Sequence, residues 1–578
     1  MEDIATTSPY LFEKNVSVPL RHGGIIRCNV YRPHNTDRGE KYPVLVTYGP
    51  YGKDIPYQDF NSGSYSLLNP HHQTDHSSWE TPTPSYWTAY GYVVVRADEV
   101  GTGQSPGFLN VLTPGNTFDA FHDLIEWASE RKWSTGKIGL LGISYFGATQ
   151  WHVASRNPKG LAAIVPWEGF TDLYRDAAYH GGILSSTFFQ VWWDNQVGCN
   201  QYGSVKAHRY GPEPQQGPLD EAELAKMRVD LPVDNRKHRY RDDPRYAGAN
   251  LNLQDVKVPV LSVANWGGVG LHLRGNVNGF LHAASEFKYI RFIVGRHDLP
   301  FYLDEEVEVQ RSFLDAFLKG DDRVGWSKKG QVPPVDLLLR KGDDPAKFTR
   351  RAELEWPLAR TQYTNFYLSK DGSLLSNPVM TDTPQKLSYK ALGTAQSPQS
   401  ISFTTPPFDT EHEITGHITA RLYVSASAHL WHSPPSDIDL FLTLRHLDSS
   451  GKELFGTGSF GDPIPVTRGW LRVSLRKVNV NHPYHRSWQP HRDYNSTDVL
   501  PVIPNEIYEA DVEFWPTNVI VAARERLVLE VSSGDTAQTG VWEHNDPVDR
   551  NSQKFQGMNH LHFGEQYVNY ITLPIIPF

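Results

Sequence analysis

The segment that most limits how this chain can fold is residues 137–151, KIGLLGISYFGATQW. It places Ser144 between an apolar run typical of a buried strand and a run typical of a helix, with Gly142 before the serine and Gly147 three positions after it. A strand that turns sharply into a helix holds the turning residue in a strained conformation, which small neighbours permit. The segment therefore predicts an outward-projecting serine hydroxyl. The alternative is a plain tight turn or a helix N-cap.

Strand and helix signals alternate around this segment. The runs 41–49, 91–98 and 161–169 are apolar and β-branched and end in turn residues, whereas 117–132 has apolar residues at helical spacing. Alternation of this kind predicts a parallel sheet whose strands are joined by helical crossovers.

The alternation is interrupted once. Residues 170–250 carry helix signals and polar connections, and strand signals return at 258–266 and 289–298. We therefore expect an α/β domain built from residues 1–169 and 251–345, with residues 170–250 inserted as a helical cap.

The last part of the chain, residues 346–578, has a different pattern. Short alternating runs are separated by Gly, Pro, Asn and Asp, and almost no helical period is present. The expected strands lie within residues 417–427, 437–448, 470–478, 507–515, 526–535 and 567–576. Regular strands with turn residues between them predict a β-sandwich or jelly roll.

Composition excludes several classes of protein. The formal charge is −10 and no block of Lys and Arg occurs, so neither nucleic acid nor an anionic membrane is an expected partner. No stretch approaches the roughly 20 apolar residues that a membrane span needs, and residues 1–20 lack the pattern of a secretory signal. Two cysteines, Cys28 and Cys199, cannot form a disulfide framework, which favours a cytoplasmic location.

Three motifs together resemble a known family. GISYFG at 142–147, GPYGKD at 49–54 and RADEVGTGQSPG at 96–107 are similar to motifs of the CocE/NonD hydrolases, the family that contains cocaine esterase and the X-prolyl dipeptidyl peptidases. The resemblance covers essentially the whole chain. It implies an α/β-hydrolase fold with an inserted helical cap and a C-terminal jelly-roll β-sandwich, a small-molecule acyl substrate, and no cofactor or metal. One departure is Val100, where the family usually has arginine.

The expected oxyanion hole combines two tyrosines. The main-chain N–H of Tyr145 follows the serine at a helix N-terminus, where it can donate to a developing negative charge. The resemblance implies that Tyr51 supplies its phenol as the second donor. A packed core aromatic is the alternative for Tyr51.

The expected base is His297, at the end of the predicted strand at 289–298. The family tends to read Gly-Pro-Trp-x-His, and here Leu299 occupies the usual histidine position, so a surface or core histidine is the alternative. The orienting acid also departs from the pattern, because Gly268 stands where relatives have aspartate.

An acid can instead follow the strand after the nucleophile helix, and Glu168 lies there. The order Ser144, Glu168, His297 keeps nucleophile, acid and base along the chain. Asp172 lies a turn later, and Asp298 is too close to His297 in sequence to orient its ring easily. A carboxylate at the cap hinge is the alternative role for Glu168.

Aromatic residues around the cap predict the substrate pocket. The expected wall residues are Trp167, Phe188, Phe189, Trp192, Trp193 and Trp266. The triplet His71, His72 and His76 lacks metal-ligand spacing, so no metal site is expected. Residues 542–550, WEHNDPVDR, have turn chemistry and are interpreted as a sandwich loop.

These features predict a serine hydrolase acting on a carboxylic ester or related acyl compound. Two enzymatic alternatives stay open: an X-Pro dipeptidyl peptidase, and a non-hydrolytic acyl transfer, cyclisation or elimination in small-molecule biosynthesis (secondary metabolism). A pseudoenzyme is disfavoured by the intact serine motif, and the sequence leaves a homo-oligomer open.

Overall fold

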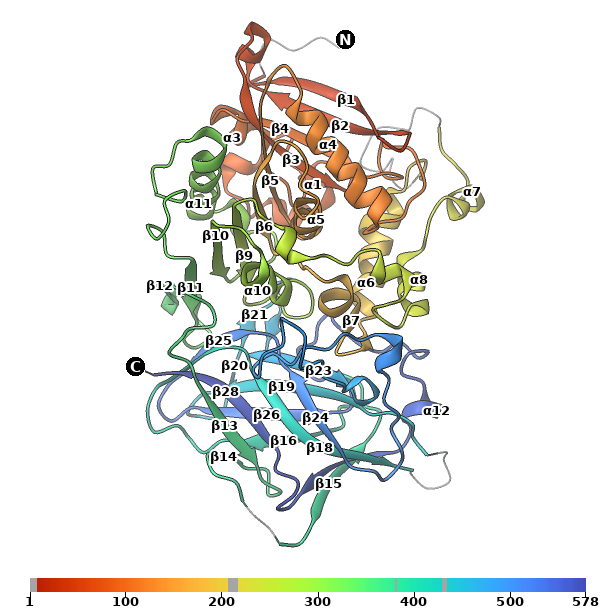
Figure 1. Cartoon of the computed structure of the whole chain (residues 1–578), viewed down its shortest axis with the longest axis vertical. Coiled ribbons are helices and arrows are strands. Elements are labelled where there is room, and N and C mark those ends of the chain that lie inside the picture. The colour runs from red at the N-terminus through yellow and green to blue at the C-terminus, as the bar shows by residue number, and fades with distance from the viewer. Residues whose placement is uncertain (1–7, 206–216, 380–381, 429–433, 578) are drawn as a thin grey trace.

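The computed structural model describes residues 8–205, 217–379, 382–428 and 434–577 (Figure 1). Two domains are stacked along the long axis of the molecule, an α/β domain in the upper half of the figure and a β-rich domain in the lower half. The described chain ends close to the junction between them. This architecture confirms the fold class expected from the sequence.

The upper domain is built on a ten-stranded sheet, counted over the described residues, in the order β1-β2-β4-β3-β5-β6-β9-β10-β11-β12. The pairs from β4 to β11 are parallel, and the outer pairs at both edges are antiparallel. The carboxyl ends of β5, β6, β9 and β10 therefore meet at one edge. The strands are β1 (Leu11–Pro19), β2 (Ile25–Arg32), β3 (Tyr42–Gly49), β4 (Val93–Asp98), β5 (Ser134–Ile143), β6 (Leu161–Trp167), β9 (Val260–Asn265), β10 (Lys288–Ile293), β11 (Val335–Leu339) and β12 (Thr349–Glu353).

Both faces of this sheet are buried, which explains the unbroken apolar runs of its strands. Along β3, Val44 and Val46 pack in one hydrophobic cluster and Leu45 in another. The first cluster also holds apolar residues of α4 and α5, and the second holds residues of α11. The main helices are α4 (Ala120–Ser129), α5 (Tyr145–Ala154), α10 (Leu273–His282) and α11 (Asp304–Leu314).

Two details differ from expectation. The sheet continues to β12, beyond the boundary expected at residue 345. Within the cap, a small hairpin interrupts the helices, because Gly181 and Gly182 have positive φ and form the turn between β7 (Tyr179–His180) and β8 (Ile183–Leu184). The cap helices are α6 (Thr187–Trp192), α7 (Glu221–Lys226), α8 (Leu231–Lys237) and α9 (Pro244–Ala247).

The chain segment that connects β3 to β4 contains three short helices that were not expected from the sequence. They are α1 (Tyr57–Phe60), α2 (Ser62–Tyr65) and α3 (Pro84–Ala89). The segment brings Trp79 and Glu80 to the carboxyl edge of the sheet, where both line the cavity at Ser144.

The lower domain packs antiparallel sheets over a separate hydrophobic core. One sheet contains β13 (Gln362–Leu368), β14 (Leu374–Leu375), β15 (Gln385–Lys390), β17 (His412–Gly416), β18 (Thr419–Ser427), β24 (Tyr508–Glu513), β25 (Thr517–Val521), β27 (Met558–Phe563) and β28 (Tyr570–Ile576). The other contains β16 (Ser400–Thr404), β19 (Asp439–Leu447), β20 (Glu453–Leu454), β23 (Thr467–Arg472) and β26 (Arg526–Ser532). A small hairpin of β21 (Gly456–Thr457) and β22 (Pro463–Ile464) and the short helix α12 (Ser552–Phe555) complete the domain.

The domains meet through close and charged contacts. The Arg274 guanidinium on α10 pairs with Glu513 of β24 at 2.9 Å. A Cβ on Gly181 would lie 2.0 Å from the carbonyl oxygen of Trp470, so the cap hairpin touches β23 directly. No helix among the described residues combines the length and apolar character that crossing a bilayer requires.

Candidate active site

Ser144 lies between the end of β5 and the start of α5 in a strained conformation, with φ 61° and ψ −115°. Its main-chain N–H donates to the carbonyl of Trp167 at 3.0 Å, which ties the corner to the end of β6. A Cβ on Gly147 would lie 2.6 Å from that same carbonyl oxygen. The second glycine of the motif therefore serves close packing of α5 against β6, and its shifted position does not disturb the turn.

The Ser144 hydroxyl contacts a histidine that the sequence did not single out. Its Oγ lies 3.1 Å from Nε2 of His272, the residue that precedes α10. The His272 ring is parallel to the rings of Phe170 and His297, with centroids 5.8 and 5.2 Å away. Burial, with a contribution from His297, lowers the pKa of His272 well below its ordinary value, so this imidazole is neutral. Its position after a glycine-rich turn gave no sequence signal.

His297 is held between two carboxylates. Its Nδ1 lies 2.8 Å from Oε2 of Glu168, and its Nε2 lies 3.2 Å from Oε1 of Glu80. Burial opposes the charged imidazole, but Glu168 and then Glu80 outweigh it and raise the pKa of His297 well above its usual value. His297 and Ser144 line the same cavity, while the histidine that contacts the serine hydroxyl is His272.

Of the acids weighed from the sequence, Glu168 is the one beside His297. It follows β6, is fully buried, and accepts from the Asn265 side chain at 3.1 Å. Asp172 instead pairs with two arginines outside this cavity, and Asp298 accepts from the Tyr57 hydroxyl.

The glycine that replaces the expected aspartate lies next to the same carboxylate. A Cβ on Gly268 would be 3.7 Å from Oε2 of Glu168. An aspartate at position 268 would therefore project toward the place that the Glu168 carboxylate fills.

Three residues of the site have positive φ: Glu80 at 61°, Ser144 at 61° and Glu168 at 44°. Such backbone strain in residues other than glycine is concentrated at functional sites. Glu80 is buried, its Oε2 has no hydrogen-bond partner, and burial raises the pKa of its carboxyl. Glu80 lies in a stretch with no motif, so sequence reasoning missed it.

Both expected oxyanion donors are next to the serine. Burial is the main cause that raises the pKa of Tyr51 well above its usual value, while hydrogen bonds with Trp192 and Ser144 oppose the rise, so the phenol keeps its proton. The Trp192 indole N–H donates to the Tyr51 oxygen at 3.0 Å, which fixes the ring. Tyr145 is the first residue of α5, so its main-chain N–H belongs to the unpaired donors of a helix start.

The serine opens into a cavity of about 40 Å³ with aromatic walls. Phe188 and Trp192 line it as expected, and Phe460 and Trp542 join them from the β-rich domain. Trp542 belongs to the segment interpreted from the sequence as a plain sandwich loop, so that interpretation was incomplete. A second cavity of about 220 Å³ shares Tyr51, His297 and other residues with the first.

The other four aromatic residues expected in the wall do not line these cavities. Trp266 stacks on Phe292 at 4.1 Å, and Trp167 packs edge-on against Phe301 at 5.3 Å. Phe189 and Trp193 are buried in the same core cluster as Trp167. These side chains follow strand and helix faces that point into the core, which the sequence pattern did not distinguish from pocket faces.

The histidine triplet near residue 71 is dispersed. His72 lies 2.9 Å from the Thr83 hydroxyl, and His76 lies 2.5 Å from the Tyr10 hydroxyl. Within the described ranges, one group with metal-ligand geometry is found, His482, His491 and Asp493, and it lies outside the cavity at Ser144.

Two family models together match most of the chain. Residues 23–297 match the model of the X-Pro dipeptidyl-peptidase (S15) family, and residues 327–572 match that of the X-Pro dipeptidyl-peptidase C-terminal non-catalytic domain. The chain is 25% identical to the cocaine esterase of Rhodococcus sp. (strain MB1 Bresler), over 98% of this chain and 99% of that protein.

Solved structures show the same architecture. The CocE/NonD family hydrolase of Staphylococcus aureus superposes with a TM-score of 0.82 at 27% identity, over 98% of this chain and 94% of that chain. An α-amino acid ester hydrolase shares the fold, with a TM-score of 0.69 at 16% identity over 100% of this chain and 98% of its own.

Proposed function

The chain belongs to the CocE/NonD family of serine hydrolases, and on that premise we propose that it cleaves a carboxylic ester through a serine-bound acyl intermediate. The observation that carries the proposal is the 2.8 Å contact between His297 Nδ1 and Glu168 Oε2, in the cavity that holds the strained Ser144. A nucleophile needs a base, and the base needs a group that orients it.

The proposed reaction has two halves. The His297 ring first moves so that its Nε2 leaves Glu80 and faces the serine hydroxyl. Ser144 Oγ then attacks the ester carbonyl while His297 Nε2 takes the proton of the hydroxyl. Catalytic hydrogen bonds often tighten only when substrate is bound. His297 then gives the proton to the leaving alcohol, and the same steps with water release the acid and free the serine.

The other groups act on position and charge. Glu168 holds the ring of His297 and stabilises its cationic form, as the third member of a triad does. Tyr51 and the Tyr145 N–H donate to the carbonyl oxygen as it becomes negative. His272 holds the serine hydroxyl in place in the resting site.

The cavities favour a substrate with an apolar or aromatic acyl group. Six aromatic side chains surround the small cavity at Ser144, and apolar walls of this kind with few polar groups are typical of small-molecule sites. The adjoining cavity of about 220 Å³ has room for a leaving alcohol. The lining aromatics are Tyr51, Trp79, Phe188, Trp192, Phe460 and Trp542.

Turnover of p-nitrophenyl acetate, butyrate and benzoate tests the proposal. We expect a burst of nitrophenol of about one equivalent per active site, and a fall in kcat of about 10³-fold or more in Ser144→Ala. Ser66→Ala, an exposed serine whose hydroxyl donates to Gly63, is the control and should stay active. Full turnover by Ser144→Ala would refute the proposal.

One observation favours a second substrate class, X-Pro peptides. A dipeptidyl peptidase must hold the substrate ammonium with a carboxylate, and Glu80 Oε2 is buried without a partner in the wall of the cavity. Release of nitroaniline from Ala-Pro-p-nitroanilide at a kcat/KM above that of the esters would favour the peptidase.

A non-hydrolytic reaction in small-molecule biosynthesis is the third candidate. The hydroxyl of Ser144 is hydrogen-bonded to His272, whose Nδ1 is buried without a hydrogen-bond partner, whereas Glu168 orients His297. Mass spectrometry of products formed with added alcohols and amines distinguishes acyl transfer from hydrolysis. We place the reaction in the cytoplasm, because two cysteines in a chain of 578 residues cannot form a disulfide framework.

A further inference from the structure

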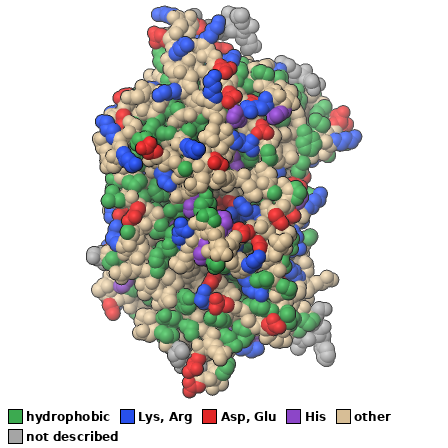
Figure 2. All heavy atoms as spheres, viewed as in Figure 1, with side chains coloured by type: hydrophobic (Ala, Val, Ile, Leu, Met, Phe, Trp, Pro, Cys, Tyr) green, Lys and Arg blue, Asp and Glu red, His purple; other side chains and the backbone are tan. Residues whose placement is uncertain are grey.

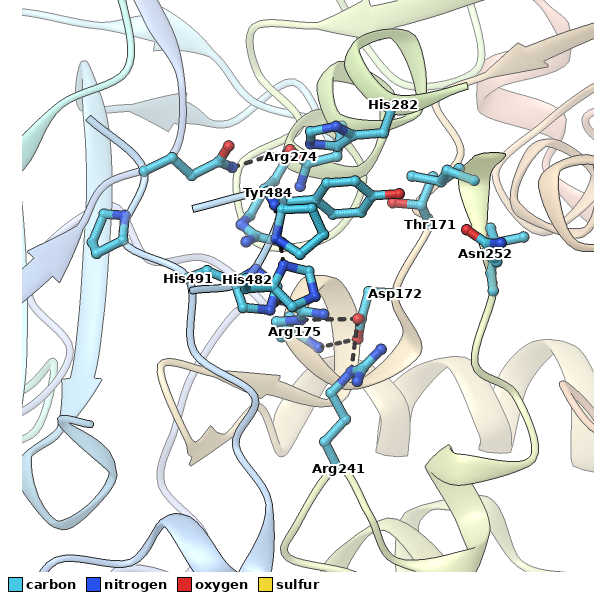
Figure 3. A pocket seen from close by; sticks show the side chains of 16 residues that line it. Thr171, Asp172, Arg175, Arg241, Asn252, Arg274, His282, His482, Tyr484 and His491 are labelled. Atoms are coloured by element: carbon cyan, nitrogen blue, oxygen red, sulfur yellow. Dashed lines mark hydrogen bonds and ion pairs between the residues drawn. The ribbon is translucent and has the colours of Figure 1, made fainter. Parts of the chain in front are cut away.

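A separate cavity of about 270 Å³ lies where the α/β domain meets the β-rich domain. Figure 2 shows histidine side chains gathered at mid-height on this face, at the level where the two domains meet. Figure 3 shows the cavity from close by. Its charged and aromatic lining includes Arg175, Arg241, Arg274, His482, Tyr484 and His491.

Two arginines in the lining of this cavity share one carboxylate. Asp172 pairs with Nε of Arg175 at 2.9 Å and with Nε of Arg241 at 3.0 Å. Figure 3 shows Asp172 between these two arginines. The third arginine of the lining, Arg274, pairs with Asp176 at 2.7 Å and Glu513 at 2.9 Å, neither of which lines the cavity. Among the charged side chains that line the cavity, three arginines therefore lie beside one carboxylate, Asp172.

The walls of the cavity are two pairs of stacked rings. His482 lies on His491 with centroids 3.5 Å apart, and His282 lies on Tyr484 at 3.7 Å. Burial, followed by Arg175, lowers the pKa of His491 to about 2, and burial, followed by Arg486, lowers the pKa of His282 to about 3. Neutral stacked rings therefore lie beside the guanidinium groups in the wall of the cavity.

A bound cation is the competing interpretation, because His482, His491 and Asp493 offer ligand atoms within 4.8 Å of one another. However, the Arg175 guanidinium lies 3.4 Å from both ring nitrogens of His491. A positive charge at that distance repels a metal ion and attracts an oxyanion.

We propose that this cavity binds a small oxyanion, a carboxylate or phosphate group, through Arg175 and Arg241. Guanidinium groups present paired N–H donors that match the oxygens of either group. The site is distinct from the cavity at Ser144, with which it shares no lining residue.

The cavity also lies close to the catalytic groups along the chain. Arg274 and His282 line it from α10, and His272, at the start of the same helix, contacts Ser144. Thr171 and Asp172 line it three and four residues after Glu168, the carboxylate beside His297. A bound anion therefore contacts two segments that also build the active site.

Isothermal titration of the full-length Ser144→Ala protein with inorganic phosphate and with benzoate tests the proposal at fixed ionic strength. This protein cannot turn over ester, so the result is independent of the proposed function. We expect saturable binding of at least one anion. The anion that binds shows whether the cavity takes a phosphate or a carboxylate group. Arg241→Gln should weaken that binding about tenfold or more, because it removes a charged hydrogen-bond donor.

Arg486→Gln is the matched control. Arg486 lies on the loop that carries His482, Tyr484 and His491. Its guanidinium donates hydrogen bonds to the carbonyls of Pro483 and His485, and it does not line the cavity. Because Arg486 acts on the cavity only through its charge near His282, Arg486→Gln should weaken anion binding much less than Arg241→Gln does. Thermal melting verifies that both variants fold. Failure of both anions to bind, equal binding by Arg241→Gln, or saturable binding of Zn²⁺ that His482→Asn removes would overturn the proposal.

Discussion

Two imidazoles lie near the Ser144 hydroxyl, and their surroundings differ. His272 contacts the hydroxyl directly, but its Nδ1 is buried without a hydrogen-bond partner, so nothing stabilises a proton gained at Nε2. His297 has Glu168 on one nitrogen and Glu80 on the other. Because a general base becomes a cation in the transition state, the neighbouring carboxylates favour His297 as the base.

Substitution of the two histidines should separate their roles. We expect His297→Gln to lower kcat for p-nitrophenyl esters by about 10³-fold or more, as loss of a triad base does. His272→Gln removes only a hydrogen bond that positions the serine, and should cost about tenfold. Steady-state kinetics of the two proteins, each checked by thermal melting, decides between them. The reverse order of effects would make His272 the base.

The pH profile should report the carboxylates around His297. Burial disfavours its charged form, but Glu168 and Glu80 outweigh burial and raise the pKa of His297. Only the neutral ring accepts a proton, so kcat/KM should rise with pH and level off above the ordinary histidine range. Glu80→Gln removes one negative charge and lowers this pKa, so the rising limb should shift to lower pH. A limb that stays in place, or shifts upward, would show that Glu80 does not act on the base.

At the scale of strands and helices, the proposed acid, Glu168, and the position where the resemblance implies an aspartate, Gly268, follow different strands. Glu168 follows β6, whereas Gly268 follows β9, the neighbouring strand in the sheet. The two positions converge, because a Cβ on Gly268 would lie 3.7 Å from Oε2 of Glu168. Parallel strands that end at one edge can therefore supply the same carboxylate from either strand.

This exchange predicts a rescue. Glu168→Gln should lower kcat by about 10²-fold or more, because the ring of His297 loses its charged partner. Adding Gly268→Asp should restore at least part of the loss, since the new side chain starts beside the vacated place. Gly268→Asn in the same background matches the size without the charge and should restore nothing. If the aspartate and asparagine proteins are equally inactive, the carboxylate of residue 268 cannot reach His297.

Local sequence patterns were sufficient to predict many of the strands. The apolar runs that became β3, β4, β5 and β6 were predicted because each strand is buried on both faces. The strand expected at 470–478 ends at Arg472, since the chain turns there and Arg476 N–H donates to Val473. Periodicity does not record such a turn.

The candidate site was predictable only in part, because sequence patterns predict regular strands but not irregular connections. Ser144, Glu168 and His297 each follow a strand, so their meeting at one edge follows from the sheet. Glu80 and His272 are brought there by irregular connections, whose long-range packing leaves no local pattern.

At the scale of the whole molecule, residues of both domains build the proposed active site. The main-chain N–H of His297 donates to the carbonyl of Ser459 at 2.8 Å, in the turn between β21 and β22. A Cβ on Gly267 would lie 2.0 Å from the carbonyl oxygen of Thr457, so the hairpin packs directly on the turn after β9. The β-rich domain therefore supports the loop of the base and closes the acyl cavity.

Loss of one aromatic residue of the β-rich domain should change substrate preference. Trp542 packs on Phe188 at 4.7 Å in the wall of the cavity. Trp542→Ala should raise KM for the benzoate ester by about tenfold and change the acetate ester much less, because an aromatic acyl group loses apolar contact. Val548→Ala, at a residue 63% exposed in the same segment, is the control. Equal effects on both esters would place Trp542 outside the acyl site.

The most direct measurement is intact-mass analysis of the full-length protein after treatment with a fluorophosphonate, followed by peptide mapping. We expect one equivalent of phosphonate on Ser144, no adduct in Ser144→Ala, and much slower labelling in His297→Gln. A folded protein that stays unlabelled, or carries its adduct on another residue, would contradict a nucleophilic serine at this corner.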